Sequence, residues 1–397
     1  METDRVQTMR AESMVRATDE TRLVLVLFAL LTLGLVDTQV LAPLLPEIAR
    51  GLGTTESSVG RSVSGYAIAA AIAALLIGPR SDHRGRRPFL VGAGFLVALG
   101  SAVSATTTTI AGFTLARIVT GAGAGVISAL TVAAIADVVP YERRGRSMGW
   151  VAIAYTAAPI LGVPVAAWVA ESVGWRANYV AFAVSGIFFA LAVRLWLKES
   201  RSSPRAERRG RSYLSFLASR STAAGALSAF FVTGGVTGFL LFLGAHLQTK
   251  FGLTVGQVGM VFLLCGVASL VGAFGAGRLS DRMGKLRMTL VSSLALAVFL
   301  LVVPYVEGTV LYAMLGLVGV SVAARLAPLQ SLITELVAPD SRGAYVALRN
   351  TMSQCGNAAG ALAAAALYER GFQYVCFMTA AFSLVAFALL LRIEEPR

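Results

Sequence analysis

The chain has 397 residues, of which 56% are hydrophobic and 14% charged, and its formal net charge at pH 7 is +13. So few charged side chains cannot cover a water-soluble globule of this length, which excludes a soluble globular protein. The basic excess does not indicate a nucleic-acid partner, because such proteins gather Lys and Arg on one soluble face, whereas here these residues occupy short segments between apolar runs. The composition predicts an integral protein of the lipid bilayer.

Twelve apolar runs have the length needed to cross the hydrocarbon layer, about 20 residues each. They lie at 23–46, 59–79, 88–107, 109–136, 148–170, 178–197, 222–246, 256–277, 288–306, 309–336, 344–368 and 371–391. Lys and Arg concentrate in the segments that join alternate runs and at both chain ends, which predicts that these segments are cytoplasmic. We therefore expect an all-α, multi-pass protein of the bacterial inner membrane with both termini inside.

The first and fourth runs carry opposite charges at a similar depth. Asp37 lies about 14 Å and Arg117 roughly 12 Å below the outer surface, at ~1.5 Å per helical residue. A charge at the centre of a membrane helix costs roughly 2.5–3.5 kcal/mol on insertion scales, so such residues usually have a role. Two hypotheses stay open: a permanent bridge that locks the N-terminal half, or a pair in which Asp37 takes up and releases a proton as Arg117 moves.

A short polar signature follows the second run and recurs after the eighth. The first copy is "GPRSDHRGRRPFL" from Gly78 and the second is "GRLSDRMGKLRMTL" from Gly277. Gly78 leaves room for a close helix contact, Gly85 permits a left-handed turn, and Asp82 suits a neighbouring helix N-terminus. Asp281 and Gly284 repeat the pattern one half-chain later, which predicts two pseudo-symmetric six-helix bundles in the same orientation. Their bounds are 1–198 and 221–397, with a basic cytoplasmic linker at 199–220.

Proline and glycine interrupt two further runs. In "APILGVPVAAW" of the fifth run, Gly162 allows close packing and Pro164 predicts a bend. In the tenth run Pro328 frees a carbonyl and bends the helix, three residues after the charged Arg325. Arg325 either holds an anionic or hydroxylated group of a substrate or bonds to neighbouring carbonyls as a structural element.

The remaining polar elements exclude other kinds of site. The linker ends in Tyr213 to Leu217, which predicts a short amphipathic helix at the membrane surface. The three cysteines have neither paired nor metal-like spacing, so we expect no disulfide and no metal site. His83 and His246 fall on opposite sides of the membrane, and no nucleophile motif accompanies them, so we do not expect an enzyme.

These motifs together resemble the major facilitator superfamily, and more narrowly its branch of twelve-helix drug:proton antiporters and sugar or metabolite effluxers. The resemblance rests on the two signatures, Arg117 in "ARIVTGAGAG", the "GVP" of the fifth run and the six-plus-six layout. It implies that Asp82 and Arg86 latch the two halves in the outward-facing state, together with Gly78, Gly85, Asp281 and Gly284. It also implies that the first, fourth, seventh and tenth helices line a central cavity and that Arg117 takes part in proton coupling. The sequence departs from the family at Leu286 in the second signature and at Val165 to Ala167 after the proline of the fifth run.

The sequence thus predicts a monomeric secondary transporter that works by alternating access and exports a small amphiphilic compound against protons. The proton gradient is the expected energy source, without a cofactor. A facilitator, or an exporter of sugars or organic anions without coupling at Asp37, remains the alternative. The candidate wall residues of the cavity are Gln39, Tyr66, Tyr155, Arg325, Gln330 and Gln354.

Overall fold

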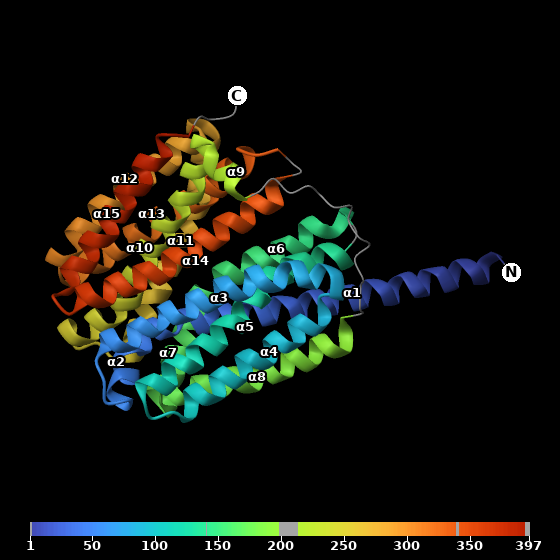
Figure 1. Cartoon of the computed structure of the whole chain (residues 1–397), viewed down its shortest axis with the longest axis horizontal. Helices are drawn as coiled ribbons and strands as arrows, with labels where there is room; N and C mark the ends of the chain where they lie inside the picture. The colour runs from blue at the N-terminus through green and yellow to red at the C-terminus, as the bar shows by residue number, and fades with distance from the viewer. Residues whose placement is uncertain (1, 140, 198–212, 339–340, 394–397) are drawn as a thin grey trace.

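A computed structural model describes residues 2–139, 141–197, 213–338 and 341–393, and these residues form helices and no strand. Two helical bundles lie side by side (Figure 1). The N-terminal bundle contains α1 (Glu2–Gln39), α2 (Leu41–Gly51), α3 (Glu56–Arg84), α4 (Arg87–Thr106), α5 (Ile110–Val138), α6 (Tyr141–Ala157), the π-helical turn η1 (Ala158–Gly162), α7 (Val163–Val173) and α8 (Trp175–Trp196). The C-terminal bundle contains α10 (Arg220–Phe251), α11 (Val255–Met283), α12 (Lys285–Val302), the 3₁₀ turn η2 (Val303–Tyr305), α13 (Gly308–Glu335), α14 (Arg342–Tyr368) and α15 (Phe372–Leu390).

Ten of the described helices are long and apolar enough to cross a membrane, or eleven if the pair α6 and η1–α7, bent by 42°, is one span. Each of the twelve predicted runs contains helix, but two runs are divided, the first between α1 and α2 and the fifth between α6 and α7. The first was predicted as one helix, yet α1 ends at Gln39 and α2 begins at Leu41. Pro43 explains this break, because it lacks the N–H that would bond to the Gln39 carbonyl four residues earlier.

The linker lies mostly outside the described residues. Its last part forms α9 (Tyr213–Ala218), where the sequence predicts a short helix. Phe216 is buried there and its ring packs on Tyr345 of α14. This helix is therefore attached to the C-terminal bundle through its apolar side.

Glycines set how closely α5 approaches α3. A Cβ at Gly121 would overlap the backbone of Tyr66, and one at Gly125 would overlap the backbone of Ala70. The close contact that the glycine run of the fourth predicted span indicates is therefore present. This approach holds α5, which carries Arg117, against the helices around Asp37.

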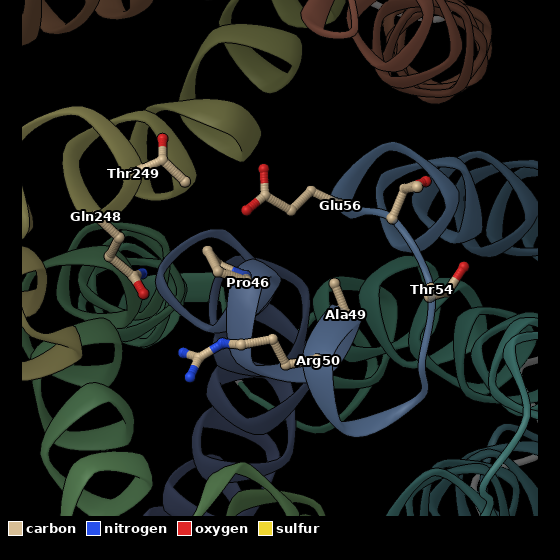
Figure 2. Close-up of a pocket in the computed structure, with 8 residues that line it drawn as sticks. Pro46, Ala49, Arg50, Thr54, Glu56, Gln248 and Thr249 are labelled. Carbon is tan, nitrogen blue, oxygen red and sulfur yellow. The ribbon is translucent and has the colours of Figure 1, made fainter.

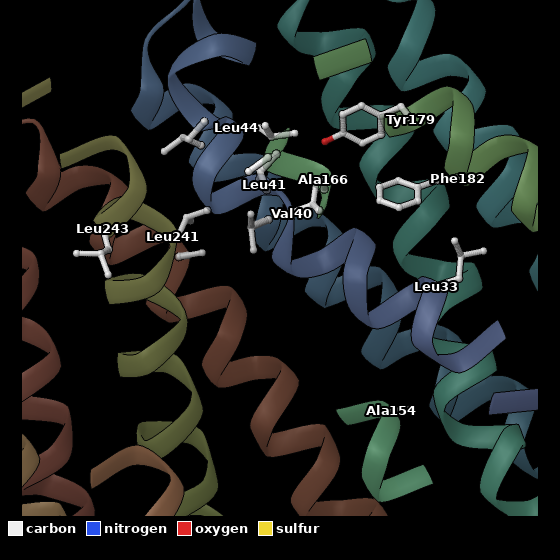
Figure 3. Close-up of a cluster of buried hydrophobic side chains, with 14 of the residues drawn as sticks. Leu33, Val40, Leu41, Leu44, Ala154, Ala166, Tyr179, Phe182, Leu241 and Leu243 are labelled. Atoms are coloured by element: carbon white, nitrogen blue, oxygen red, sulfur yellow. The ribbon is translucent and has the colours of Figure 1, made fainter. Parts of the chain in front are cut away.

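The two bundles are joined at one end. Hydrogen bonds link them there: Gln248 Nε2 donates to the Pro43 carbonyl (2.7 Å), Ser64 Oγ donates to the Ala358 carbonyl (2.8 Å), and Arg61 Nη2 donates to Glu369 Oε1 (2.9 Å). The largest buried apolar cluster contains leucines of both α2 and α10, which Figure 3 shows on neighbouring helices. Since the basic loops mark the opposite end as cytoplasmic, we call this set of contacts the outer seal.

The cytoplasmic end is arranged differently. Neither Gly78 nor Gly277 has any atom within 4 Å of the position that a Cβ would take, so the close helix contact expected at Gly78 is absent in this conformation. The bundles diverge toward the end that carries α9 and the N-terminus (Figure 1). The structure is therefore closed outside and inward-facing.

The packing at Gly121 can be tested by adding one methyl group. Gly121→Ala forces Cβ against the Tyr66 backbone and should lower the free energy of unfolding by about 1–3 kcal/mol, the usual cost of overpacking. Gly149→Ala on α6, where nothing lies within 4 Å, is the matched control. Thermal unfolding of both purified variants measures the difference, and equal stabilities would contradict the packing account.

Candidate functional site

Asp37 and Arg117 form a direct ion pair between α1 and α5. Arg117 Nη1 donates to Asp37 Oδ1 at 2.7 Å and to Oδ2 at 2.8 Å, and Nη2 donates to the Asp37 carbonyl at 3.3 Å. Both residues are sealed, with exposed fractions of 0% for Asp37 and 1% for Arg117. The sequence predicted that the two charges lie at a similar depth, and in the structure the two side chains are in direct contact.

Two tyrosines surround the guanidinium. The Arg117 guanidinium carbon lies 4.6 Å from the ring centre of Tyr66 on α3 and 5.9 Å from that of Tyr179 on α8. Thr38 Oγ1 donates to the Tyr66 hydroxyl at 2.8 Å, which ties this ring to the residue next to Asp37. Tyr66 was a candidate from sequence, but Tyr179 was missed, since no motif or spacing in a single chain points to it.

The surroundings make each charge depend on the other. Removing an ion from water costs several kcal/mol, and good geometry with a partner offsets that cost. Asp37 accepts from Arg117 with both carboxylate oxygens, while Arg117 Nε has no partner. The ionised carboxylate is therefore stable here only while Arg117 stays in place.

The pair is linked mechanically to the outer seal. Asp37 precedes the α1–α2 break by two residues, and α2 contacts the other bundle through the Pro43 carbonyl, which accepts from Gln248. Gly244 of α10 lies so close to the Ala42 carbonyl that a Cβ would not fit. A movement of Asp37 can thus be transmitted to α10 through one short helix, α2.

The other candidate wall residues are spread over both bundles. Gln39 is half-buried at the end of α1, and Tyr155 is 49% exposed on α6 with its hydroxyl 3.1 Å from Ser128 Oγ. Gln330 is exposed in the cytoplasmic part of α13, and Gln354 is half-buried on α14. The structure does not gather these four residues around the ion pair.

Arg325 does not present its charge to a shared space. It is 1% exposed inside the C-terminal bundle, where Nη1 donates to Ser383 Oγ (3.3 Å) and Nη2 donates to the Val232 carbonyl (3.2 Å). Of the two roles left open by the sequence, these contacts favour bonding to neighbouring groups. Its proposed place in the cavity wall is therefore not seen in this conformation.

The first signature forms an ion-pair group within the N-terminal bundle. Arg86 contacts Asp82 (3.1 Å) and Asp137 at the end of α5. Gly85 and its counterpart Gly284 have φ of +86° and +91°, values that favour glycine. Asp281 is exposed. The latch between the two halves stays a prediction, since the ion pairs of Arg86 described here lie within one bundle.

The residues predicted to bend helices are Gly162, Pro164 and Pro328, and each lies in a different local structure. Gly162 ends η1, and a Cβ there would overlap the side chain of Val36, next to Asp37. Pro164 lies in the first turn of α7 and faces Gly259 of α11 across the two bundles. Pro328 lies within α13, which is continuous.

A cleft of about 540 Å³ opens at the outer end beside the seal (Figure 2). Its walls come from α2, α3 and α10, and its lining residues are Pro46, Ala49, Arg50, Thr54, Thr55, Glu56, Gln248 and Thr249. The mixed charges suit polar solutes, and the sealed pair at Asp37 is not part of its lining. Among the described residues, no group of three or more His, Cys, Asp or Glu is arranged to hold a metal ion.

Comparison with known proteins gives consistent relatives. The family model of the Major Facilitator Superfamily matches residues 27–243 and 225–397. The inner membrane transport protein YdhP of Escherichia coli (strain K12) is 28% identical over 335 residues, covering 83% of this chain and 85% of that protein. A chloramphenicol resistance protein of Streptomyces lividans is 29% identical over 334 residues, covering 82% and 83% respectively.

A solved structure shares the fold. The bacterial homologue of the human lysosomal transporter Spinster, inward-facing and unoccupied, superposes with a TM-score of 0.79 at 15% identity, covering 96% of this chain and 99% of that one.

Mutual dependence of the two charges predicts a non-additive mutant cycle. Arg117→Met leaves the Asp37 carboxylate buried and unpaired, which should cost about 3–5 kcal/mol of stability. The double variant Asp37→Leu/Arg117→Met should recover most of that loss, because no charge then remains. Chemical or thermal unfolding of the purified proteins measures the cycle.

Arg325→Met is the control, because Arg325 bonds to a hydroxyl and a carbonyl instead of a carboxylate. It should cost less than Arg117→Met. Additive effects of the two substitutions in the cycle would show that the pair does not stabilise the bundle through its charges.

Proposed function

The chain belongs to the Major Facilitator Superfamily, and from that premise we propose that it is a proton-coupled exporter of a small amphiphilic compound. It is a membrane transporter and not an enzyme. In this proposal a monomer uses the proton gradient, and no cofactor, to move its substrate out of the cell. Asp37 carries the proton and Arg117 is its movable partner.

The observation that carries this proposal is the sealed Asp37–Arg117 pair in an inward-facing structure. The carboxylate here lies 2.7 Å from a guanidinium, and an adjacent opposite charge favours the ionised form of a carboxyl group. An exporter driven by protons must release its proton toward the cytoplasm before it turns outward again. A carboxylate paired with Arg117 while the cytoplasmic side is open corresponds to the state after that release.

The reverse step follows from the same contacts. When the outer side is open, a proton on Asp37 removes its attraction for Arg117 and frees the segment before α2. When α2 returns to its place against α10, Arg117 meets Asp37 again and displaces the proton toward the cytoplasm, which restores the pair. In this cycle the ionised pair holds α2 in the seal, and the protonated carboxyl does not.

Relatives support the substrate class. One similar protein is named for chloramphenicol resistance, and a resistance function fits export of an amphiphilic drug. The multi-pass fold and the inner membrane transport protein among the relatives support a place in the inner membrane.

A second candidate is a facilitator in which Asp37 and Arg117 form a permanent lock. Complete burial of both groups favours this alternative, because a buried bridge can also serve only to fix one arrangement of helices. Under that account the substrate moves without protons.

Proton movement in proteoliposomes separates the two. A dye inside the vesicles reports pH while chloramphenicol, other drugs, sugars and organic anions are added in turn. We expect substrate-evoked proton flux in the wild type and none in Asp37→Asn, while substrate binding persists. Counterflow of substrate with no proton flux in the wild type would contradict coupling and support the facilitator.

Glu307→Gln is the matched control for loss of a carboxylate. Glu307 lies in the outer connection between η2 and α13, where the hydrogen bond and charge of Lys250 lower its pKa. It therefore stays ionised near neutral pH and has no part in the proposed cycle. Its variant should keep the proton flux of the wild type.

A further inference from the structure

Helix α14 is unusually polar for a helix between two membrane bundles. It has 27 residues and is not among the helices apolar enough to cross a membrane. Asn350, Gln354 and Asn357 recur at spacings of four and three, so at 100° per residue they form one stripe about 60° wide and roughly 10 Å long. Asn350 is exposed, and Gln354 and Asn357 are half-buried.

Contacts at the top of the stripe show which way it faces. Asn357 is followed by Ala358, whose carbonyl accepts from Ser64 of α3 in the other bundle. The stripe therefore begins at the outer seal, where Asn357 also bonds to Thr237 of α10, and runs toward the cytoplasm along the part of α14 that lies between α10 and the N-terminal bundle. Carboxamides facing lipid would leave donors and acceptors unsatisfied, whereas polar residues in membrane helices usually face the protein interior or a water-filled space.

A chain of hydrogen bonds fixes the central carboxamide. Thr237 Oγ1 on α10 donates to Asn357 Oδ1 (2.8 Å), and Asn357 Nδ2 donates to Gln354 Oε1 (2.8 Å). With its oxygen occupied, Gln354 presents its amide nitrogen as a donor. The two bonds hold it in one orientation before any ligand arrives.

The charged side chains of the membrane interior are buried away from this stripe in the same conformation. The three charged residues predicted within the hydrocarbon, Asp37, Arg117 and Arg325, are each at most 1% exposed. Arg349 of α14 is half-buried, one turn closer to the cytoplasm and about 140° around the helix from Gln354. An ionic group brought to the stripe would thus be desolvated without a counter-charge from these four residues of the described chain.

We propose that Asn350, Gln354 and Asn357 form a binding site for the transported molecule, and that this molecule is uncharged and places a hydrogen-bond acceptor on the Gln354 amide nitrogen. The acceptor is a carbonyl, hydroxyl, ether or nitro oxygen. This assignment deepens the proposed function and rests on it, because it names the substrate class of the same transporter.

Binding to the purified full chain tests the site. Equilibrium dialysis would use two uncharged probes, chloramphenicol and lactose, a cation, tetraphenylphosphonium, and an anion, salicylate. We expect the wild type to bind at least one uncharged probe more tightly than either ion. Gln354→Ala should weaken that binding about 3- to 10-fold, the range for loss of one hydrogen bond between neutral groups. Gln354→Glu should weaken it further and improve binding of the cation.

Two further variants keep the test decisive. Thr351→Ala is the matched control, because the Thr351 hydroxyl bonds to the Ala347 carbonyl of its own helix, and it should bind like the wild type. Thr237→Val leaves Gln354 intact and removes the hydrogen bond that holds its partner Asn357, so it should weaken binding less than Gln354→Ala. This variant carries the test if Gln354→Ala fails to fold. Binding of neither uncharged probe, tighter binding of an ion, or Gln354 variants that match Thr351→Ala would overturn the proposal.

Failure of the proposed function is recognised separately. Asp37→Asn should still bind the uncharged probe, since Asp37 is not in the stripe. Loss of proton flux with intact Gln354-dependent binding would leave a carrier of uncharged molecules without coupling. Intact proton flux evoked by an ion, with no effect of Gln354, would keep the coupling and reject the site.

Discussion

The buried ion pair between the Asp37 carboxylate and the Arg117 guanidinium constrains the whole N-terminal bundle. Neither Asp37 nor Arg117 can be left there alone at acceptable cost, so α1 and α5 must stay in register. The glycines of α5 make this register possible, because they allow its backbone to lie against α3 without intervening side chains. Tyr66 and Tyr179 then enclose the guanidinium. The position of four helices thus depends on one ion pair.

The same pair is placed to influence the closed side of the protein. The first membrane run is divided by Pro43 just after Asp37, and the second piece, α2, carries contacts to α10. A continuous helix would spread a local change along its length, whereas a break lets α2 move as a short unit. On the opposite end, Gly78 and Gly277 have open space around them. One face is therefore held by hydrogen bonds and leucine packing while the other is open.

Much of this architecture follows from sequence patterns. Apolar length, the distribution of Lys and Arg and the repeated signature predict two helical bundles. The similar depth of Asp37 and Arg117 indicates that they belong to one site. Tyr179 and the stripe of Asn350 and Asn357 were missed, because which side of a membrane helix faces a neighbour depends on tertiary packing. Arg325 shows the same limit: its depth was evident, but only the fold shows that it bonds to Ser383 and Val232. The break at Pro43 was readable in principle from the missing N–H.

The central claim is that the charge on Asp37 holds the outer seal through α2. Spin labels at two exposed positions of the outer end, Thr108 between α4 and α5 and Thr309 in the first turn of α13, would report the separation of the bundles. The measurement uses pulsed electron resonance in a chain whose three cysteines are replaced. The account predicts a single short distance in the otherwise unchanged protein and an added longer distance in Asp37→Asn, which mimics the protonated carboxylate. An unchanged distance distribution in Asp37→Asn would contradict the account and leave the pair as a structural lock.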